Sequence, residues 1–179
     1  MHDASARMKR WGLAGVVVAS LLLPAIRAGA DAYQGSNDTE TLTTTVLSQI
    51  NITESGTQKL NFGMFVAGTA LNYITVSPAG VRTFTGGIKL LGSGASADLF
   101  TVTGDTSNPS FSITLPGSAV TLTSGSYTMT VDTFTSTPSG TGTMSSGTLN
   151  ITVGARLNVG ANQHAGAYTG SYTITVAYH

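Results

Sequence analysis

The chain has 179 residues, of which eight are basic, eight are acidic and none is cysteine. The missing cysteine excludes disulfide bonds, thiol catalysis and thiolate metal sites together. Charged residues make up only 9% of the chain, too few for the basic face that binds nucleic acid or for a polybasic membrane surface. We therefore expect no nucleic-acid partner, and we expect stability to come from burial and backbone pairing alone.

Residues 1–30 have the three regions of a secretion signal in the required order. Arg7, Lys9 and Arg10 form a basic start, residues 11–24 form an apolar stretch, and Ala28-Gly29-Ala30 supplies a small-residue cleavage site. The apolar stretch is shorter than the roughly 20 residues of a permanent membrane anchor, although an uncleaved anchor is the alternative. The sequence therefore predicts export, with a mature chain that starts near residue 31.

Residues 31–41 are mostly polar and lack apolar alternation, which predicts a disordered or weakly ordered lead-in. Residues 42–179 form the predicted domain. Without residues 1–30 the chain has 149 residues, with four basic and seven acidic side chains and a net charge of −3. This length is enough for one domain with its own core.

The segment over residues 42–53 alternates between two kinds of side chain. Its even positions are Leu42, Thr44, Val46, Ser48, Ile50 and Ile52, and its odd positions are mostly polar. A period of two places the even positions on one face of a β-strand. Because the run exceeds the usual strand length of about 5–6 residues, it is either one long strand or two short strands broken near residues 47–49.

The rest of the chain consists of short alternating runs rich in Thr, Ser, Val and Gly, separated by Gly, Pro, Asn and Asp. This pattern predicts many short strands, and hence an all-β sandwich or barrel. The expected strands cover residues 60–65, 72–76, 88–91, 99–103, 110–115, 127–134, 148–153, 156–159 and 171–178. Ser77-Pro78-Ala79-Gly80 fits a type I turn, and residues 136–147 are predicted to be a flexible loop.

The last predicted strand has the clearest alternation in the chain. Tyr172, Ile174, Val176 and Tyr178 alternate with small or polar residues. Because this strand ends one residue before the end of the sequence, we expect that its outer edge has no strand from the same chain beside it. An uncovered and strongly alternating edge is a site for pairing with another chain.

This ending resembles that of the chaperone–usher fimbrial pilins, which have a penultimate tyrosine, here Tyr178, and a glycine fourteenth from the end, here Gly166. The whole chain is similar to a family of bacterial pilin-like secreted domains of unknown function. The motifs that carry this similarity are Leu60-Asn61-Phe62-Gly63, Phe100-Thr101-Val102-Thr103-Gly104, Phe111-Ser112-Ile113-Thr114-Leu115-Pro116 and Ala165-Gly166-Ala167-Tyr168-Thr169-Gly170.

The resemblance implies an immunoglobulin-like sandwich that lacks its last strand and is completed by the N-terminal segment of the next subunit. Leu42, Thr44 and Val46 would be the donated side chains, and Ile50 and Ile52 would begin the domain proper. The acceptor strand would contain Gly166, Tyr172, Ile174, Val176 and Tyr178. Many fimbrial pilins carry a disulfide, and their donor strands often include a glycine; this chain has neither feature, and the donor register stays open.

The resemblance also implies a function and partners. The chain would be a structural fimbrial subunit that assembles by donor-strand exchange with copies of itself or related subunits and serves cell adhesion. It would pass through the periplasm, where a chaperone and an outer-membrane usher would handle it, to the cell surface or the extracellular space. The alternative is a monomeric secreted or surface binding module, adhesin-like, in which residues 42–52 pair within their own chain as an ordinary first strand.

An enzyme is the third class of function, and no group of residues supports it. Residues 92–97 match a dinucleotide-binding fingerprint, but a strand is expected after them where such a site needs a helix. His164 and His179 have no carboxylate near them in sequence.

The acidic residues Asp98, Asp105 and Asp132 lack the spacing of a calcium loop, so we interpret them as turn and edge residues. We therefore expect no catalytic residue, no metal ligand and no cofactor.

Overall fold

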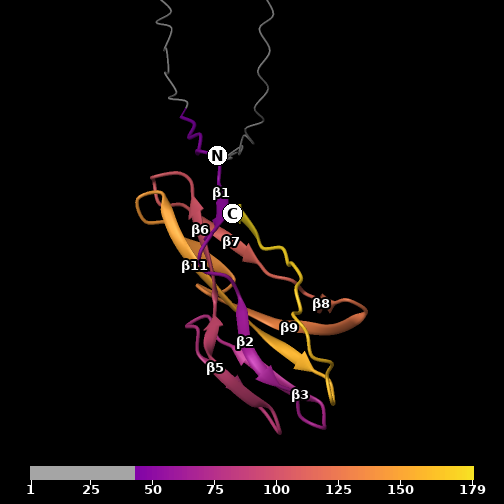
Figure 1. The fold of residues 1–179 in the computed structure, drawn as a ribbon. Coiled ribbons are helices and arrows are strands. Elements are labelled where there is room, and N and C mark those ends of the chain that lie inside the picture. The colour runs from indigo at the N-terminus through magenta and orange to yellow at the C-terminus, as the bar shows by residue number, and fades with distance from the viewer. Residues whose placement is uncertain (1–42) are drawn as a thin grey trace, which may run out of the picture. The chain divides into compact units, whose positions relative to one another are not determined.

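The computed structural model describes residues 43–179, of which residues 44–179 form one compact unit. The predicted signal, the predicted lead-in and Leu42 lie outside the described residues. The described part of the chain contains twelve strands and no helix (Figure 1), which confirms the all-β prediction. The strands are β1 (Asn51–Glu54), β2 (Asn61–Val66), β3 (Asn72–Val76), β4 (Arg82–Phe84), β5 (Lys89–Ser96), β6 (Asp98–Thr103), β7 (Ser110–Thr114), β8 (Val120–Ser124), β9 (Tyr127–Thr137), β10 (Thr141–Thr143), β11 (Thr148–Val159) and β12 (Thr175–Tyr178).

The long strand β11 is the centre of a seven-stranded antiparallel sheet. Its first half pairs with β6 and its second half with β3, while β9 lies along its other edge. Outside these, β1 pairs with β6, β4 with β3 and β8 with β9. β11 is one strand rather than the two predicted, because the chain bulges at Gly154 instead of turning. A side chain at Gly154 would collide with the backbone of residues 76–78.

Two smaller sheets, β10-β7-β12 and β2-β5, cover the large sheet. Each encloses a core together with strands of the large sheet, and this two-layer arrangement confirms the sandwich prediction. The core under the first, called here the β7 core, contains Phe100, Val102, Phe111, Ile113, Met144, Ile151 and Val153. The core under the second, called here the β2 core, contains Phe62, Ile74, Val76, Ile88, Ala97, Met129, Val131, Ala155, Leu157 and Val159.

Most strands lie where the alternation predicts them, and the turn at residues 77–80 is confirmed by a hydrogen bond of 2.8 Å from the Gly80 N–H to the Ser77 carbonyl. The structure adds β4, β8 and β10, which the sequence did not indicate. β10 lies within residues 136–147, which were predicted to be a flexible loop, and it forms a regular ladder with β7. That prediction was wrong because Gly142 lies directly against the Phe111 ring, so its lack of a side chain is needed for packing rather than for flexibility.

Candidate functional site

Two strand edges flank one side of the sandwich, with no strand of the described residues between them. β12 is an edge strand that pairs with β7. β1 is the edge of the seven-stranded sheet, and β2 pairs with β5. Side chains from both edges pack against the β7 core, so the edges enclose a groove. One wall of the groove is formed by β1 and β2 and the other by residues 163–178, the yellow segment of Figure 1.

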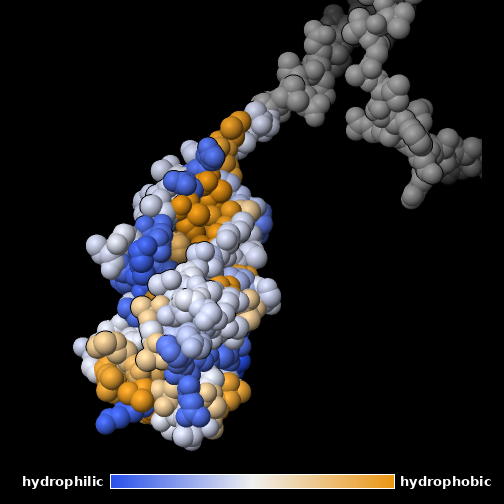
Figure 2. All heavy atoms as spheres, turned by 45° about the vertical axis from the view of Figure 1, so that its right-hand side comes forward, coloured by the Kyte–Doolittle hydropathy of each residue, from blue (hydrophilic) through white to orange (hydrophobic). Residues whose placement is uncertain are grey.

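The part of the groove next to the β7 core is lined by apolar side chains that are only partly buried. Ile50 and Ile52 come from one edge, and Ile174 and Val176 come from the other. Their positions in the alternation point them at the core, yet no described strand covers them. Figure 2 shows hydrophobic side chains gathered on the face just below the exposed N-terminal segment. Contiguous apolar surface that is left exposed is typical of interaction sites.

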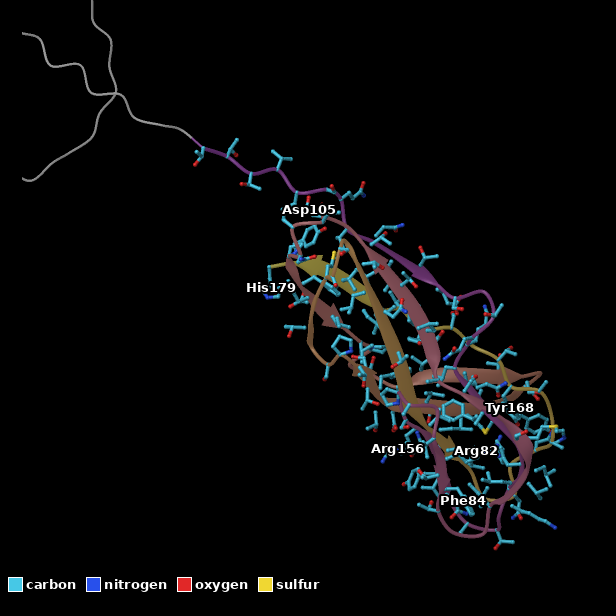
Figure 3. The ribbon with its side chains drawn as sticks, turned by 90° about the vertical axis from the view of Figure 1, so that its left-hand side faces the viewer. Arg82, Phe84, Asp105, Arg156, Tyr168 and His179 are labelled. Carbon is cyan, nitrogen blue, oxygen red and sulfur yellow. The ribbon has the colours of Figure 1, made fainter. Side chains whose placement is uncertain are left out.

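The part of the groove next to the β2 core contains an open cavity of about 1260 Å³. β2 forms one wall, residues 163–172 form the opposite wall, and β8 and β9 contribute to the floor. The apolar lining includes Phe62, Phe65, Leu122, Met129, Val131, Phe134 and Tyr168. In Figure 3, Tyr168 lies toward this end of the domain, while Asp105 and His179 lie toward the other.

A buried carboxylate separates the two parts of the groove. Asp98 is 2% exposed, and it accepts hydrogen bonds from the Tyr172 hydroxyl at 2.7 Å and from the Leu99 N–H at 3.0 Å. Tyr172 packs against the β7 core and also lines the cavity. Because Asp98 belongs to the large sheet and Tyr172 to the C-terminal segment, their contact joins the two layers in the middle of the groove.

The burial of Asp98 and Tyr172 changes the ionisation of both. Burial raises the pKa of Asp98, and the hydrogen bond from Tyr172 opposes that rise. Burial and the contact with Asp98 raise the pKa of Tyr172 above its ordinary value. The interpretation of Asp98 as a turn or edge residue was wrong, because Asp98 is in phase with Phe100 and Val102 and points inward with them. That phase is the sequence signal for its burial.

The predicted acceptor residues lie along one wall of the groove, although β12 itself is shorter than expected. The ladder begins at Thr175 rather than at residue 171. Before it, Thr169 and Thr123 exchange backbone hydrogen bonds of 2.9 and 3.0 Å. Gly166 is close enough to the Ser124 hydroxyl that a side chain at residue 166 would collide with it. The glycine therefore lets this wall approach β8.

Side-chain contacts also hold the wall in place. The Gln163 amide donates to the Tyr168 hydroxyl at 2.8 Å and to the Thr128 carbonyl at 3.1 Å, and the Tyr168 hydroxyl donates to the His164 carbonyl at 2.9 Å. The His164 ring stacks on Tyr127 with centroids 3.7 Å apart. These contacts connect the wall to β9 and to itself.

At the opposite end of the groove, hydrogen bonds to Asp105 connect the last strand to the N-terminal segment. The Asp105 N–H donates to the Tyr178 hydroxyl at 2.9 Å, and the Asp105 carboxylate accepts from the Ser48 N–H at 3.0 Å. Hydrogen bonds from Ser107 and from Ser48 lower the pKa of Asp105 to about 2. Gly104 has no room for a side chain, because the Tyr178 hydroxyl and Met144 occupy that space.

Residues 43–49 form no strand and are exposed. Val46 is 86% exposed, and the hydrogen bond from Ser48 to Asp105 ties the base of the segment to the domain. Of the predicted donor residues, Thr44 and Val46 are therefore exposed and belong to no strand of their own domain, and Leu42 lies outside the described residues. Of residues 43–54, only Asn51–Glu54 pairs as a strand, forming β1 on β6.

Within the described residues, no three His, Cys, Asp or Glu side chains are grouped as metal ligands would be. Residues 92–97 lie on or directly after β5 and are followed by β6, so the helix that a dinucleotide site needs does not follow them. In residues 43–179, no helix has the length and apolar character needed to cross a membrane.

A family model described as a domain of unknown function, DUF4402, matches residues 50–178. The match begins at the point where the exposed segment joins the domain, and it ends with the last strand. No curated protein and no solved structure matches the chain.

Proposed function

The chain belongs to the DUF4402 family of domains of unknown function, and from the geometry of the groove we propose that it is a structural subunit of a bacterial surface fibre. In this proposal, the N-terminal segment of one subunit fills the groove of the next by donor-strand exchange. The observation that carries the proposal is that one chain contains both an apolar groove that no strand of residues 43–179 covers and an exposed segment with the alternation of a strand.

The groove supplies what an added strand needs. The outer edge of β12 has no strand beside it in the described part of the chain, so its backbone groups can pair with an extended segment. The partly buried side chains on both walls, including Ile52 and Ile174, would be covered by the inward side chains of that segment. Main-chain hydrogen bonds would supply affinity, and burial of apolar surface would add to it.

The exposed segment has the features of a strand that could fill this groove. Leu42, Thr44 and Val46 share one face of an extended chain, and the described part of the segment contacts its own domain at Ser48. Because the donating and accepting surfaces are different parts of one subunit, the contact is head to tail and does not close on itself. Repetition of such a contact produces an open filament.

The proposal has consequences for location and partners. A segment that fits the groove of any identical subunit would also pair during synthesis, so a periplasmic chaperone that occupies the groove would be needed during export. An outer-membrane usher would then exchange the chaperone for the next subunit. The signal-like residues 1–30 support export to the cell surface.

Gel electrophoresis of the exported protein in detergent, with and without boiling, tests the proposal. We expect a ladder of oligomers without boiling and a single band after boiling. Val46→Asp should abolish the ladder because it places a charge on the inward face of the donated strand. Thr45→Asp is the matched control, since residue 45 faces outward, and it should retain the ladder.

A single monomer band for the unboiled wild-type protein would contradict the fibre proposal. That result would favour a monomeric surface binding module that fills the groove with its own segment. An equal loss of the ladder in the two variants would show that residues 45 and 46 do not lie on opposite faces of a donated strand.

A further inference from the structure

The lining of the groove is not uniformly apolar, because the polar side chains of Asp98 and Tyr172 interrupt it midway. Asp98, Phe100 and Val102 share the inward face of β6. On the opposite wall, Tyr172 precedes Ile174 and Val176 on the inward face. The contact of 2.7 Å between the Tyr172 hydroxyl and Asp98 lies between the apolar surface of the β7 core and the cavity next to the β2 core.

The Asp98–Tyr172 pair can accept a hydrogen bond from one more donor. The Asp98 carboxylate accepts one hydrogen bond from the Tyr172 hydroxyl and one from the Leu99 N–H, whereas an ionised carboxylate has about four acceptor sites. The Tyr172 hydroxyl uses its proton in the bond to Asp98 and keeps acceptor capacity of its own. Burial raises the pKa of Asp98, so its carboxylate is poorly solvated and would gain from another donor.

The order of side chains in the exposed segment matches the order of apolar and polar surfaces along the groove. Its inward face reads apolar, hydroxyl, apolar at Leu42, Thr44 and Val46. Leu42 and Val46 are about 13 Å apart in an extended strand that advances about 3.3 Å per residue. A segment centred on Thr44 therefore places one apolar side chain in each part of the groove, whichever way it runs.

Shifts by one or by two residues are less favourable. A shift by two residues would place the methyl groups of Leu42 or Val46 against a buried carboxylate, and would leave the Thr44 hydroxyl in apolar surroundings. A shift by one residue would turn the apolar face outward.

Resting on the proposed function, we propose that the donated strand is held in register by the Thr44 hydroxyl, which meets the Asp98–Tyr172 pair of the accepting subunit. Leu42 and Val46 then fill the two apolar parts of the groove on either side. Thr44 is thus the residue of the segment that selects the register, and Leu42 and Val46 supply most of the burial. This assignment fixes the register that the sequence left open.

Labelled peptides of residues 41–50 test this register. Each peptide is added to the full exported chain, where it competes with the chain's own donor segments for the groove, and fluorescence polarisation measures how much peptide binds. The competing segments are the same for every peptide, so relative affinities can be compared directly. Thr44→Val should weaken binding about tenfold, the loss expected for one buried hydrogen bond. Thr43→Val and Thr45→Val make the same chemical change on the outward face and should alter binding by less than about twofold.

A double-mutant comparison locates the partner of Thr44. In the Tyr172→Phe protein, and separately in Asp98→Asn, the difference between the wild-type and Thr44→Val peptides should shrink. Circular dichroism checks that each variant is folded. If only one of the two variants folds, that variant alone is sufficient for the comparison.

Two outcomes overturn the register. One is equal binding of the Thr44→Val and Thr45→Val peptides, and the other is a large loss for Ser48→Ala in place of Thr44→Val. In both cases binding of the wild-type peptide would still support the groove as a strand acceptor. Failure of the wild-type peptide to bind, together with absence of oligomers, would instead overturn the proposed function itself.

Discussion

Residues 43–50 and residues 168–178 have the same alternation of side chains, but they have different surroundings in the structure. The C-terminal segment lies on the sandwich, where β12 pairs with β7 and its inward side chains pack against the β7 core. Residues 43–49 form no strand, and Val46 is 86% exposed. The C-terminal segment has the edge of β7 to pair with, whereas residues 43–49 pair with no strand of the described residues. Alternation therefore makes a segment able to form a strand but does not specify which edge it joins.

The largest expected effect comes from placing the two segments side by side in one chain. Residues 41–50 are repeated after His179 through a short turn, so that they can lie antiparallel beside β12. Because burial of Leu42 and Val46 contributes roughly 1.5–3 kcal/mol for each side chain, the free energy of unfolding should rise by about 3 kcal/mol. Urea denaturation measures this rise, and the protein should become monomeric.

A tail of the same composition in scrambled order is the control for this fusion and should leave stability and oligomers unchanged. Equal stabilisation by both tails would show that the groove does not select the alternation.

The next effect concerns the end of the paired segment. Gly104→Ala should destabilise the domain by about 1–3 kcal/mol, the usual cost of overpacking, because the new methyl group collides with the Tyr178 hydroxyl and Met144. Amide exchange at Val176 and Ala177 should accelerate as the end of β12 loosens. Gly117→Ala is the matched control, since no atom lies within 4 Å of the added methyl group, and it should change stability by less than about 0.5 kcal/mol.

The pH dependence of stability gives a third test of the groove. The pKa of Asp98 is raised by burial in the folded state, so its protonated form favours folding. This stabilisation is complete below the unfolded pKa of about 3.9 and is lost as the pH rises through the folded value. Urea unfolding of wild type and Asp98→Asn across this range should show the decline in the wild-type protein alone. An equal decline in the two proteins would exclude Asp98 as its source.

A smaller effect concerns the base of the exposed segment. Asp105→Ala removes the acceptor for the Ser48 N–H, so exchange of the Ser48 amide should accelerate and oligomers should form severalfold more slowly. Binding of a free peptide of residues 41–50 should be unchanged, because the groove is intact. Slower peptide binding in this variant would place the effect in the groove instead of in the segment.

The smallest effect is expected away from both segments. Arg156 donates to Asp132 at 2.8 Å and lowers the pKa of Asp132 to about 2. The stabilisation from this carboxylate is present above its unfolded pKa of about 3.9 and is lost as the pH falls toward 2. Asp132→Asn should therefore lower stability slightly at neutral pH but not near pH 2, and the oligomer ladder should persist. A loss of the ladder would connect this ion pair to assembly.

Local pattern was sufficient for much of this fold. The alternation at residues 72–76 predicted β3 with its observed bounds, and the turn at residues 77–80 followed from the preferences of Ser, Pro and Gly. The inward face of Tyr172–Tyr178 was also predicted from the sequence. These features depend on neighbours within a few residues, and that is the range over which period and turn chemistry act.

Other features were decided by contacts between residues far apart in sequence. Asp98 is buried because β6 pairs on both sides and Tyr172, distant in sequence, supplies its hydroxyl. β10 exists because β7 offers it an edge. The sequence alone determined that residues 42–52 could form a strand, while the tertiary structure decided that β6 accepts only Asn51–Glu54. The physical reason is that backbone pairing requires a free edge, and only the folded chain determines which edges are free.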